Sequence, residues 1–264
     1  MASAELKARL EVAIAAARQA GEITLRYFRR DNFQVEIKQD ASPVTVADRE
    51  SEQYLREQIA AAFPGDGILG EEFGEQTGTS GYRWILDPID GTKSFVYGVP
   101  LYGTLIGIEF EDRCRVGVIN MPALDQRVYA AEGEGAWFQE GDATPTPARV
   151  NQTATLAESL FLTSEVEGFN KVGRFETFAG LQSAVKFART WGDCYGYLLV
   201  ATGRAEVMVD PRMSVWDAAS MQPILEEAGG TFTDWEGQST VHSGNGIATN
   251  GMVLEEVLKY TRKQ

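Results

Sequence analysis

The chain has 264 residues, of which 44% are hydrophobic and 23% charged, a composition typical of a folded protein of one or two domains rather than a disordered one. Its 24 basic and 38 acidic residues give a formal net charge of −14, which argues against binding to nucleic acid or to an anionic membrane. Two cysteines, no signal-peptide pattern and no apolar run of membrane-spanning length favour a reducing, cytoplasmic location.

The first part of the chain predicts two helices and three short strands. Apolar residues recur at helical spacing in the helical segments, and the second helix ends where Pro64 and Gly65 begin a turn. The predicted helices are 4–29 and 47–63, and the predicted strands are 34–37, 68–70 and 82–86. Residues 40–43 are predicted to form a loop.

Segments rich in β-forming residues and separated by short turns follow, and these favour antiparallel hairpins. They are residues 104–109, 114–120, 128–131 and 135–139. Residues 141–147 contain two prolines and no apolar residue larger than alanine, so we predict a linker there. Beyond it, strands are expected at 159–163, 185–188, 206–209 and 231–233, and helices at 193–202, 216–228 and 252–263. This alternation indicates an α/β or α+β fold in two halves, 1–145 and 146–264.

The most informative motif is Asp-Pro-Ile-Asp-Gly-Thr at residues 87–92. A buried strand delivers Asp87 to its carboxyl end, where α/β sheets usually build ligand sites. Pro88 and Gly91 then allow the chain to turn, so that Asp87 and Asp90 can converge on a cation or a shared proton. An ordinary acidic turn is the alternative, because Asp, Pro and Gly are all common in turns.

Further acids occur at the ends of other predicted elements. Glu71 follows a strand, and Asp217 and Asp48 stand at the starts of helices, where either could merely cap the helix. Oxygen ligands of this kind suit Mg²⁺. A zinc site is disfavoured, because the single His242 and two isolated cysteines cannot supply its usual ligands.

Together these motifs resemble the inositol monophosphatase-like phosphatases, a magnesium-dependent and lithium-sensitive family. The resemblance rests on residues 45–48, Gly-Glu-Glu at 70–72, residues 87–92 and Trp-Asp-Ala-Ala at 216–219. It implies a layered αβαβα sandwich of the inositol monophosphatase/fructose-1,6-bisphosphatase type. It also implies a homodimer, with most metal ligands in the first half and Asp217 and the substrate-selecting residues in the second.

The resemblance also implies roles for single residues. Glu71, Asp87 and the carbonyl of Ile89 would hold one Mg²⁺, and Asp87, Asp90 and Asp217 a second, with Glu71 contributing to a third and weaker site. Thr92, helped by Asp48, would orient and deprotonate the attacking water, while the N–H groups of Gly91 and Thr92 would hold the phosphate. Two residues separate the acids, unlike the Asp-x-Asp-x-Thr motif of aspartyl-phosphate phosphatases, so we predict direct attack by water without a phospho-enzyme.

The substrate must be selected by residues around the leaving group. Gly-Thr-Lys-Ser-Phe at 91–95, Gly-Asp-Cys-Tyr-Gly-Tyr at 192–197 and Gly-Ile-Ala-Thr-Asn at 246–250 resemble the histidinol-phosphatase branch of the family. In inositol-specific members the position of Asp193 is usually small and uncharged, and that of Asp210 is typically Glu. Two added carboxylates suit histidinol phosphate, which carries an ammonium and an imidazole. Asp193 could instead be a helix N-cap, and Asp210 a turn acid before Pro211.

The predicted substrate-binding residues are Lys93, Asp193, Asp210 and Arg189, with Arg212 and Lys38 as further candidates that could equally be surface charges. The aromatic residues Trp191, Tyr195 and Tyr197 could stack on an imidazole or belong to the core. The sequence therefore predicts a histidinol-phosphatase. An inositol-1-monophosphatase, a broad-specificity or nucleotide phosphatase of the same family, and a non-catalytic metal-binding regulator stay open as alternatives.

Overall fold

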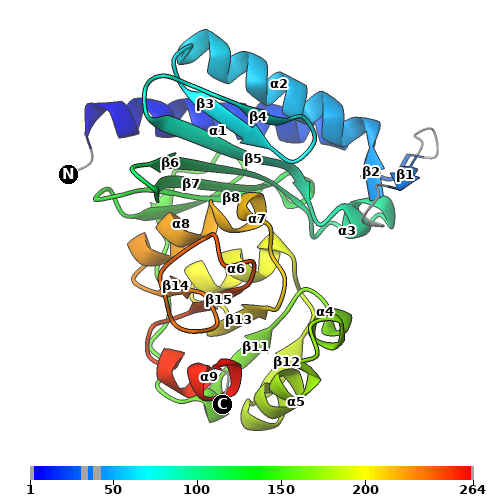
Figure 1. Cartoon of the computed structure of the whole chain (residues 1–264), viewed down its shortest axis with the longest axis vertical. Coiled ribbons are helices and arrows are strands. Elements are labelled where there is room, and N and C mark those ends of the chain that lie inside the picture. The colour runs from blue at the N-terminus through cyan, green and yellow to red at the C-terminus, as the bar shows by residue number, and fades with distance from the viewer. Residues whose placement is uncertain (1–2, 31–34, 38–42, 263–264) are drawn as a thin grey trace.

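The computed structural model describes residues 3–30, 35–37 and 43–262. They form five layers, helix–sheet–helix–sheet–helix, stacked from top to bottom in Figure 1, as the predicted αβαβα sandwich requires. The top layer is α1 (Ala4–Leu25) and α2 (Val46–Ala62); the middle layer is α6 (Cys194–Ala201), α7 (Val215–Ala218) and α8 (Met221–Glu227); the bottom layer is α4 (Val166–Lys171), α5 (Phe175–Ala184) and α9 (Leu254–Thr261).

The upper sheet has eight strands in the order β10-β9-β8-β7-β6-β5-β3-β4. The strands are β3 (Gly67–Gly70), β4 (Gly74–Gln76), β5 (Tyr82–Asp90), β6 (Gly103–Phe110), β7 (Arg113–Met121), β8 (Gln126–Ala131), β9 (Ala136–Glu140) and β10 (Thr146–Pro147). Alternate residues of β5 face opposite layers, as a pleated strand requires. Trp84 and Leu86 pack toward α1 and α2, whereas Ile85 packs toward the middle helices.

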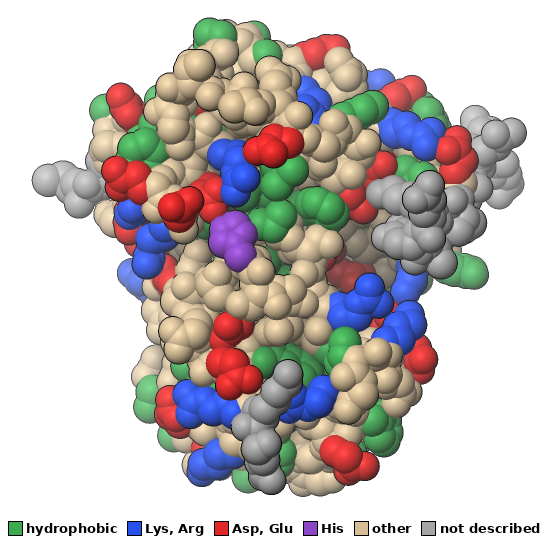
Figure 2. All heavy atoms as spheres, viewed as in Figure 1, with side chains coloured by type: hydrophobic (Ala, Val, Ile, Leu, Met, Phe, Trp, Pro, Cys, Tyr) green, Lys and Arg blue, Asp and Glu red, His purple; other side chains and the backbone are tan. Residues whose placement is uncertain are grey.

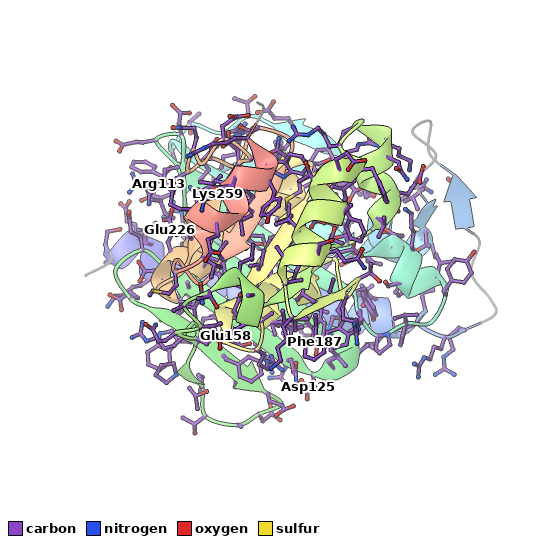
Figure 3. The ribbon with its side chains drawn as sticks, turned by 90° about the horizontal axis from the view of Figure 1, so that it is seen from below. Arg113, Asp125, Glu158, Phe187, Glu226 and Lys259 are labelled. Carbon is purple, nitrogen blue, oxygen red and sulfur yellow. The ribbon has the colours of Figure 1, made fainter. Side chains whose placement is uncertain are left out.

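The lower sheet has five strands in the order β12-β11-β13-β15-β14. They are β11 (Leu160–Leu162), β12 (Phe187–Arg189), β13 (Val207–Asp210), β14 (Thr231–Thr233) and β15 (Gly246–Thr249). β11 runs parallel to both β12 and β13. Figure 3 shows α5 and α9 lying side by side beneath this sheet. A separate two-stranded ribbon pairs β1 (Val35–Ile37) with β2 (Pro43–Thr45), and the short helix α3 (Thr92–Val96) follows the Asp-Pro-Ile-Asp-Gly motif.

The prediction of one helix over 216–228 was wrong, because the chain breaks there into α7 and α8. The break at Ala219 and Ser220 presses against the upper sheet where that sheet carries Gly107 and Gly117. A Cβ atom at Gly107 would lie 2.5 Å from the Cβ of Ala219, and one at Gly117 would lie 2.2 Å from the carbonyl oxygen of Ser220. This close approach holds α7, which carries Asp217, against the sheet that carries Asp87 and Asp90.

Other differences from the prediction are local. The predicted linker is partly incorrect, since Thr146 and Pro147 form β10 and pair with β9 at the sheet edge. The sequence reading missed α4, α5, β4 and β15. Residue 34 of the first predicted strand, and residues 40–42 of the predicted loop, lie outside the described residues.

The middle apolar core is built from both predicted halves of the chain. Ile85, Leu105 and Ile119 of the upper sheet pack in one cluster with Leu198, Ile224 and Phe232 from the second half. At the edge of this cluster, Arg113 of β7 donates to Glu226 of α8 over 2.6 Å (Figure 3). The first half supplies all of the upper sheet except β10, and the second half supplies β10 and the lower sheet. The division of the chain into separate domains at residue 145 stays a prediction. No helix within the described ranges is long and apolar enough to cross a bilayer.

Candidate metal-dependent active site

A bulge in β5 brings Asp87 and Asp90 together. In a regular strand, residues three apart point to opposite faces. Here Asp87 pairs with Leu105 and Asp90 with Gly103, so β5 advances three residues while β6 advances two. The extra residue re-aims the second carboxylate. Pro88, between the two acids, has no N–H for the ladder, and its carbonyl accepts from the hydroxyl of Thr104 over 3.0 Å.

Asp217 completes the cluster from the second half of the chain. One carboxylate oxygen from each of Asp87, Asp90 and Asp217 lies within 4.8 Å of the other two. Each carboxylate also accepts a backbone N–H: from Ile89 at 3.0 Å, Cys194 at 2.6 Å and Ser214 at 2.7 Å, respectively. Asp217 does cap its helix through a reciprocal pair with Ser214, and this capping leaves its predicted metal role open.

The electrostatics of this cluster are unfavourable without a cation. Burial, followed by the charges of Glu71, Asp90 and Asp217, raises the pKa of Asp87 well above its usual value. Burial likewise raises the pKa of Asp217 to about 7. Burial and the charges of Asp193 and Asp217 raise the pKa of Asp90. Mutual repulsion of this kind disfavours the charged form of every member.

The donor set fits magnesium. In the part of the chain that the structure describes, no lysine or arginine forms an ion pair with Asp87, Asp90 or Asp217. Three converging carboxylates with only oxygen donors are suited to a hard divalent cation with positions left for water and phosphate. The residues present therefore fit the magnesium site that the sequence predicts.

Asp48 lies at the first turn of α2 and is buried. Its Oδ2 accepts from the backbone N–H of Thr45 at 2.8 Å and from the Thr45 hydroxyl at 2.6 Å. Burial raises its pKa to about 7, and the charges of Glu72 and Glu71 add to this shift. The predicted catalytic acids Asp48 and Glu71 are therefore near one another. Thr92, at the start of α3, donates its hydroxyl hydrogen to the carbonyl of Ile89 over 3.1 Å.

Glu52, one turn after Asp48, fixes the segment that carries Glu71. Its fully buried carboxylate accepts from the N–H groups of Glu72 at 2.7 Å and Phe73 at 3.2 Å, and from Arg56 at 2.8 Å. It occupies the space beside Gly70, where a Cβ would lie 2.0 Å from its Oε1. The sequence reading missed Glu52, although its i+4 spacing from Asp48 within a predicted helix places both acids on one face.

We expect Glu52→Gln to raise the Mg²⁺ concentration for half-maximal phosphatase activity by about tenfold. Gln keeps one acceptor oxygen but loses the charge, and losing the equivalent of one charge-assisted bond at the lower end of roughly 1.5–3 kcal/mol corresponds to about tenfold. The KM of a generic ester should change little. Calorimetric titration with Mg²⁺ measures the same loss without turnover. Glu57→Gln is the control, since Glu57 is exposed on the same helix and, among the described residues, accepts from Gln53 at 2.9 Å. An unchanged Mg²⁺ response in Glu52→Gln would contradict this positioning role.

The acidic cluster opens into a cavity of about 340 Å³ between the two halves. Figure 2 shows a hollow at the right of the molecule, between its upper and lower parts, with acidic side chains inside and basic ones along the lower rim. The predicted residues that line the cavity are Asp90, Gly91, Thr92, Lys93, Asp193, Asp210, Arg212 and Asp217, together with the aromatic Tyr197.

The predicted substrate-binding residues occupy different places. Asp193 is the N-cap residue of α6 but makes no side-chain cap bond. Its Oδ2 packs over Gly91, where a Cβ would lie only 2.8 Å away; the φ of 82° at Gly91 also favours glycine. Asp210, at the end of β13, is buried among hydrogen-bond donors. Lys93 forms an ion pair with Glu165 at 2.8 Å.

Arg189 does not line the cavity; it is exposed on β12, and its guanidinium donates to the carbonyl of Ala188. Trp191 is also exposed away from the cavity, and Tyr195 packs against the middle core. Lys38 lies outside the described residues. The sequence reading missed Ser164 and Glu165, although both follow the strand predicted at 159–163, the same strand-end position that identified Asp87.

Comparisons with known proteins identify the family of this chain. The sequence profile described as the inositol monophosphatase family matches residues 5–264. The chain belongs to the inositol monophosphatase family. It is 45% identical to a histidinol-phosphatase of Chlorobaculum parvum, with 92% of this chain and 93% of the relative covered. It is 40% identical to a histidinol-phosphatase of Mycobacterium tuberculosis, with 94% and 96% covered.

A solved inositol monophosphatase (IMPase) from Thermotoga maritima has the same fold. Its TM-score against this chain is 0.85 at 31% sequence identity, with 96% of each chain covered. Family membership, the αβαβα fold and the resemblance to the histidinol-phosphatase branch are thus confirmed. For this member of the inositol monophosphatase family, the roles of individual site residues stay predictions.

Proposed function

We propose that this protein is a magnesium-dependent phosphomonoesterase that hydrolyses L-histidinol phosphate to L-histidinol and phosphate, a step of histidine biosynthesis. The observation that carries the proposal is the position of Asp193. Its carboxylate packs over Gly91 of the metal-site motif and lines the cavity. Burial, followed by the charge of Asp210, raises its pKa to about 6. A cationic leaving group would offset this cost, whereas a polyol would not.

The chain's own residues supply the rest of the reaction. Asp87, Asp90, Asp217, Glu71 and the carbonyl of Ile89 would hold two or three Mg²⁺ ions. When bound, these ions supply charge neutralisation at the phosphoryl oxygens and lower the pKa of water. The N–H groups of Gly91 and Thr92 are assigned to the phosphate.

Thr92 and Asp48 are assigned to orienting the attacking water and accepting its proton. The Thr92 hydroxyl hydrogen is committed to the Ile89 carbonyl, so the oxygen presents lone pairs that accept from water. Asp87 is held by the N–H of Ile89 among the other acids, which suits a ligand rather than a nucleophile. We therefore propose direct attack by water on phosphorus, with no aspartyl-phosphate intermediate.

The test compares kcat/KM for L-histidinol phosphate and inositol 1-phosphate over a magnesium titration. We expect a preference of about 100-fold for histidinol phosphate, since one charge-assisted contact contributes about 1.5–3 kcal/mol and each 1.36 kcal/mol is tenfold. Activity that does not respond to magnesium would exclude the metal-dependent mechanism. Equal kcat/KM values for the two esters would favour a broad-specificity or inositol-type phosphatase instead.

We further propose a homodimer located in the cytoplasm, with lithium as an inhibitor that competes at the magnesium sites. Light scattering coupled to gel filtration measures the oligomeric state. Activity measured against lithium concentration at fixed magnesium checks the inhibition.

A further inference from the structure

The carboxylates of the cavity differ in how many of their hydrogen-bond acceptor positions are already used by the protein. Asp210 accepts four hydrogen bonds: Oδ1 from the Thr163 hydroxyl at 3.2 Å and the Ser164 N–H at 2.8 Å, and Oδ2 from the Ser164 hydroxyl at 3.0 Å and Tyr197 at 2.9 Å. A carboxylate has about four lone-pair sites. The fold therefore uses the full capacity of Asp210 to hold the cavity wall in place.

Asp193 lies beside the metal-site motif and also lines the cavity. Its Oδ2 packs on Gly91, and its charge is, after burial, the main cause of the raised pKa of Asp90.

Glu165 occupies a different position. It lies in the turn between β11 and α4, lines the cavity, and leaves 44% of its side chain exposed. Its Oε2 is 2.8 Å from the Nζ of Lys93, which is 65% exposed, and Lys171 is 3.8 Å from its other oxygen. The Lys93–Glu165 pair thus joins α3 of the first half to the β11–α4 turn of the second, across the cavity. An exposed ion pair of this kind contributes only about 0–1 kcal/mol, so it can exchange partners readily.

Lys93 directly follows Thr92 in the helix turn assigned to the phosphate. An ester that places its phosphate there brings an anion next to Lys93 and sends its leaving group toward Glu165. A leaving group with an ammonium would replace the single Lys93–Glu165 contact by two charge-assisted contacts. A neutral leaving group would break the pair and leave Glu165 with the more distant Lys171.

We propose that Glu165 is the specificity residue that recognises an ammonium on the leaving group, with Lys93 as its counter-ion in the free enzyme. The inference rests on the proposed phosphatase activity and names its substrate class as esters that carry a cation two carbons from the ester oxygen. Histidinol phosphate belongs to this class, and so does ethanolamine phosphate.

The test uses ethanolamine phosphate and 2-hydroxyethyl phosphate, which differ only in an ammonium or a hydroxyl at the same carbon. We expect the wild-type enzyme to favour ethanolamine phosphate by about tenfold in kcat/KM. Glu165→Gln should bring this ratio close to one by lowering kcat/KM for ethanolamine phosphate, while kcat/KM for 2-hydroxyethyl phosphate stays the same. Lys93→Met should widen the ratio, because Glu165 then has lost its nearest competing cation. Glu167→Gln, an exposed neighbour on α4 that accepts from Asn170, should leave the ratio unchanged.

Calorimetric Kd values for both esters, measured with calcium in place of magnesium, test the same ratio without turnover. Three outcomes would overturn the inference. They are a wild-type ratio near one, a preference that persists in Glu165→Gln, and a preference that is lost only in Asp193→Asn. Failure to hydrolyse histidinol phosphate, with the ethanolamine ratio still lost in Glu165→Gln, would refute the proposed substrate and leave the role of Glu165 standing.

Discussion

Replacing Asp87 by Asn should lower kcat at saturating magnesium by about 10³-fold or more, since losing one preorganised electrostatic group costs 10²–10³-fold and Asp87 is predicted to serve two metal sites. The same change should leave the metal-free melting temperature equal or higher. Asn retains an acceptor for the N–H of Ile89 while removing one charge from a buried, mutually repelling cluster. Steady-state kinetics and thermal melts with and without magnesium measure both effects.

Asp234→Asn is the matched control for this experiment. Asp234 is also buried and accepts backbone N–H groups, from Glu236 at 2.9 Å and Gln238 at 2.8 Å, in a turn beside the lower sheet that lies outside the cavity lining. This variant should keep its activity and its stabilisation by magnesium. A variant at Asp87 with more than about a tenth of wild-type kcat would refute the predicted role, because a tenfold loss is only 1.36 kcal/mol.

Stabilisation by magnesium should increase steeply with pH. Folding raises the pKa of Asp217 and Asp48 to about 7, from a usual value of 3.8, through burial above all. The folded chain therefore holds protons that the unfolded chain has lost, and the free energy of unfolding of the metal-free protein falls as pH rises from about 4 to about 7. Magnesium held by Asp217 would replace the proton there, so magnesium binding is opposed at low pH and favoured at high pH.

Melting temperatures at about pH 5 and pH 8, with and without magnesium near 100 times its Kd, check this expectation. Such a ligand excess stabilises by about 2.7 kcal/mol, which corresponds to roughly 5–10 °C for a chain of this size. We expect a rise of that order at the higher pH and a much smaller one at the lower pH. Equal shifts at both pH values would show that Asp217 does not bind the metal.

The sequence predicted well those parts of the site whose chemistry is local. Asp217 stands at the start of a helix, as predicted, and Asp87 follows the predicted strand 82–86, although β5 continues through it to Asp90. The fold class could also be predicted, because alternating strands and helices permit few layered arrangements. The bulge that turns Asp90 toward Asp87 was only hinted at by Pro88.

The features that the sequence did not predict depend on contacts between residues far apart in the chain. The break between α7 and α8 follows from their close approach to Gly107 and Gly117, which no helical periodicity can reveal. The hydrogen bonds that occupy the Asp210 carboxylate come from Thr163, Ser164 and Tyr197. Only folding brings these three residues together, because Tyr197 lies on α6 and the other two follow β11. Glu165 became a candidate only when its ion pair with Lys93, 72 positions earlier, placed it across the cavity.

The middle apolar core, shared by both halves, has a consequence for the synthesis of the chain. The upper sheet is complete once Pro147 has left the ribosome, and α1 and α2 already cover its upper face. Its lower face, with Ile85, Leu105 and Ile119, has no cover until α6, α7 and α8 follow. A nascent chain with such a surface is prone to association. Crowded polysomes should therefore be the setting in which this protein depends most on chaperones.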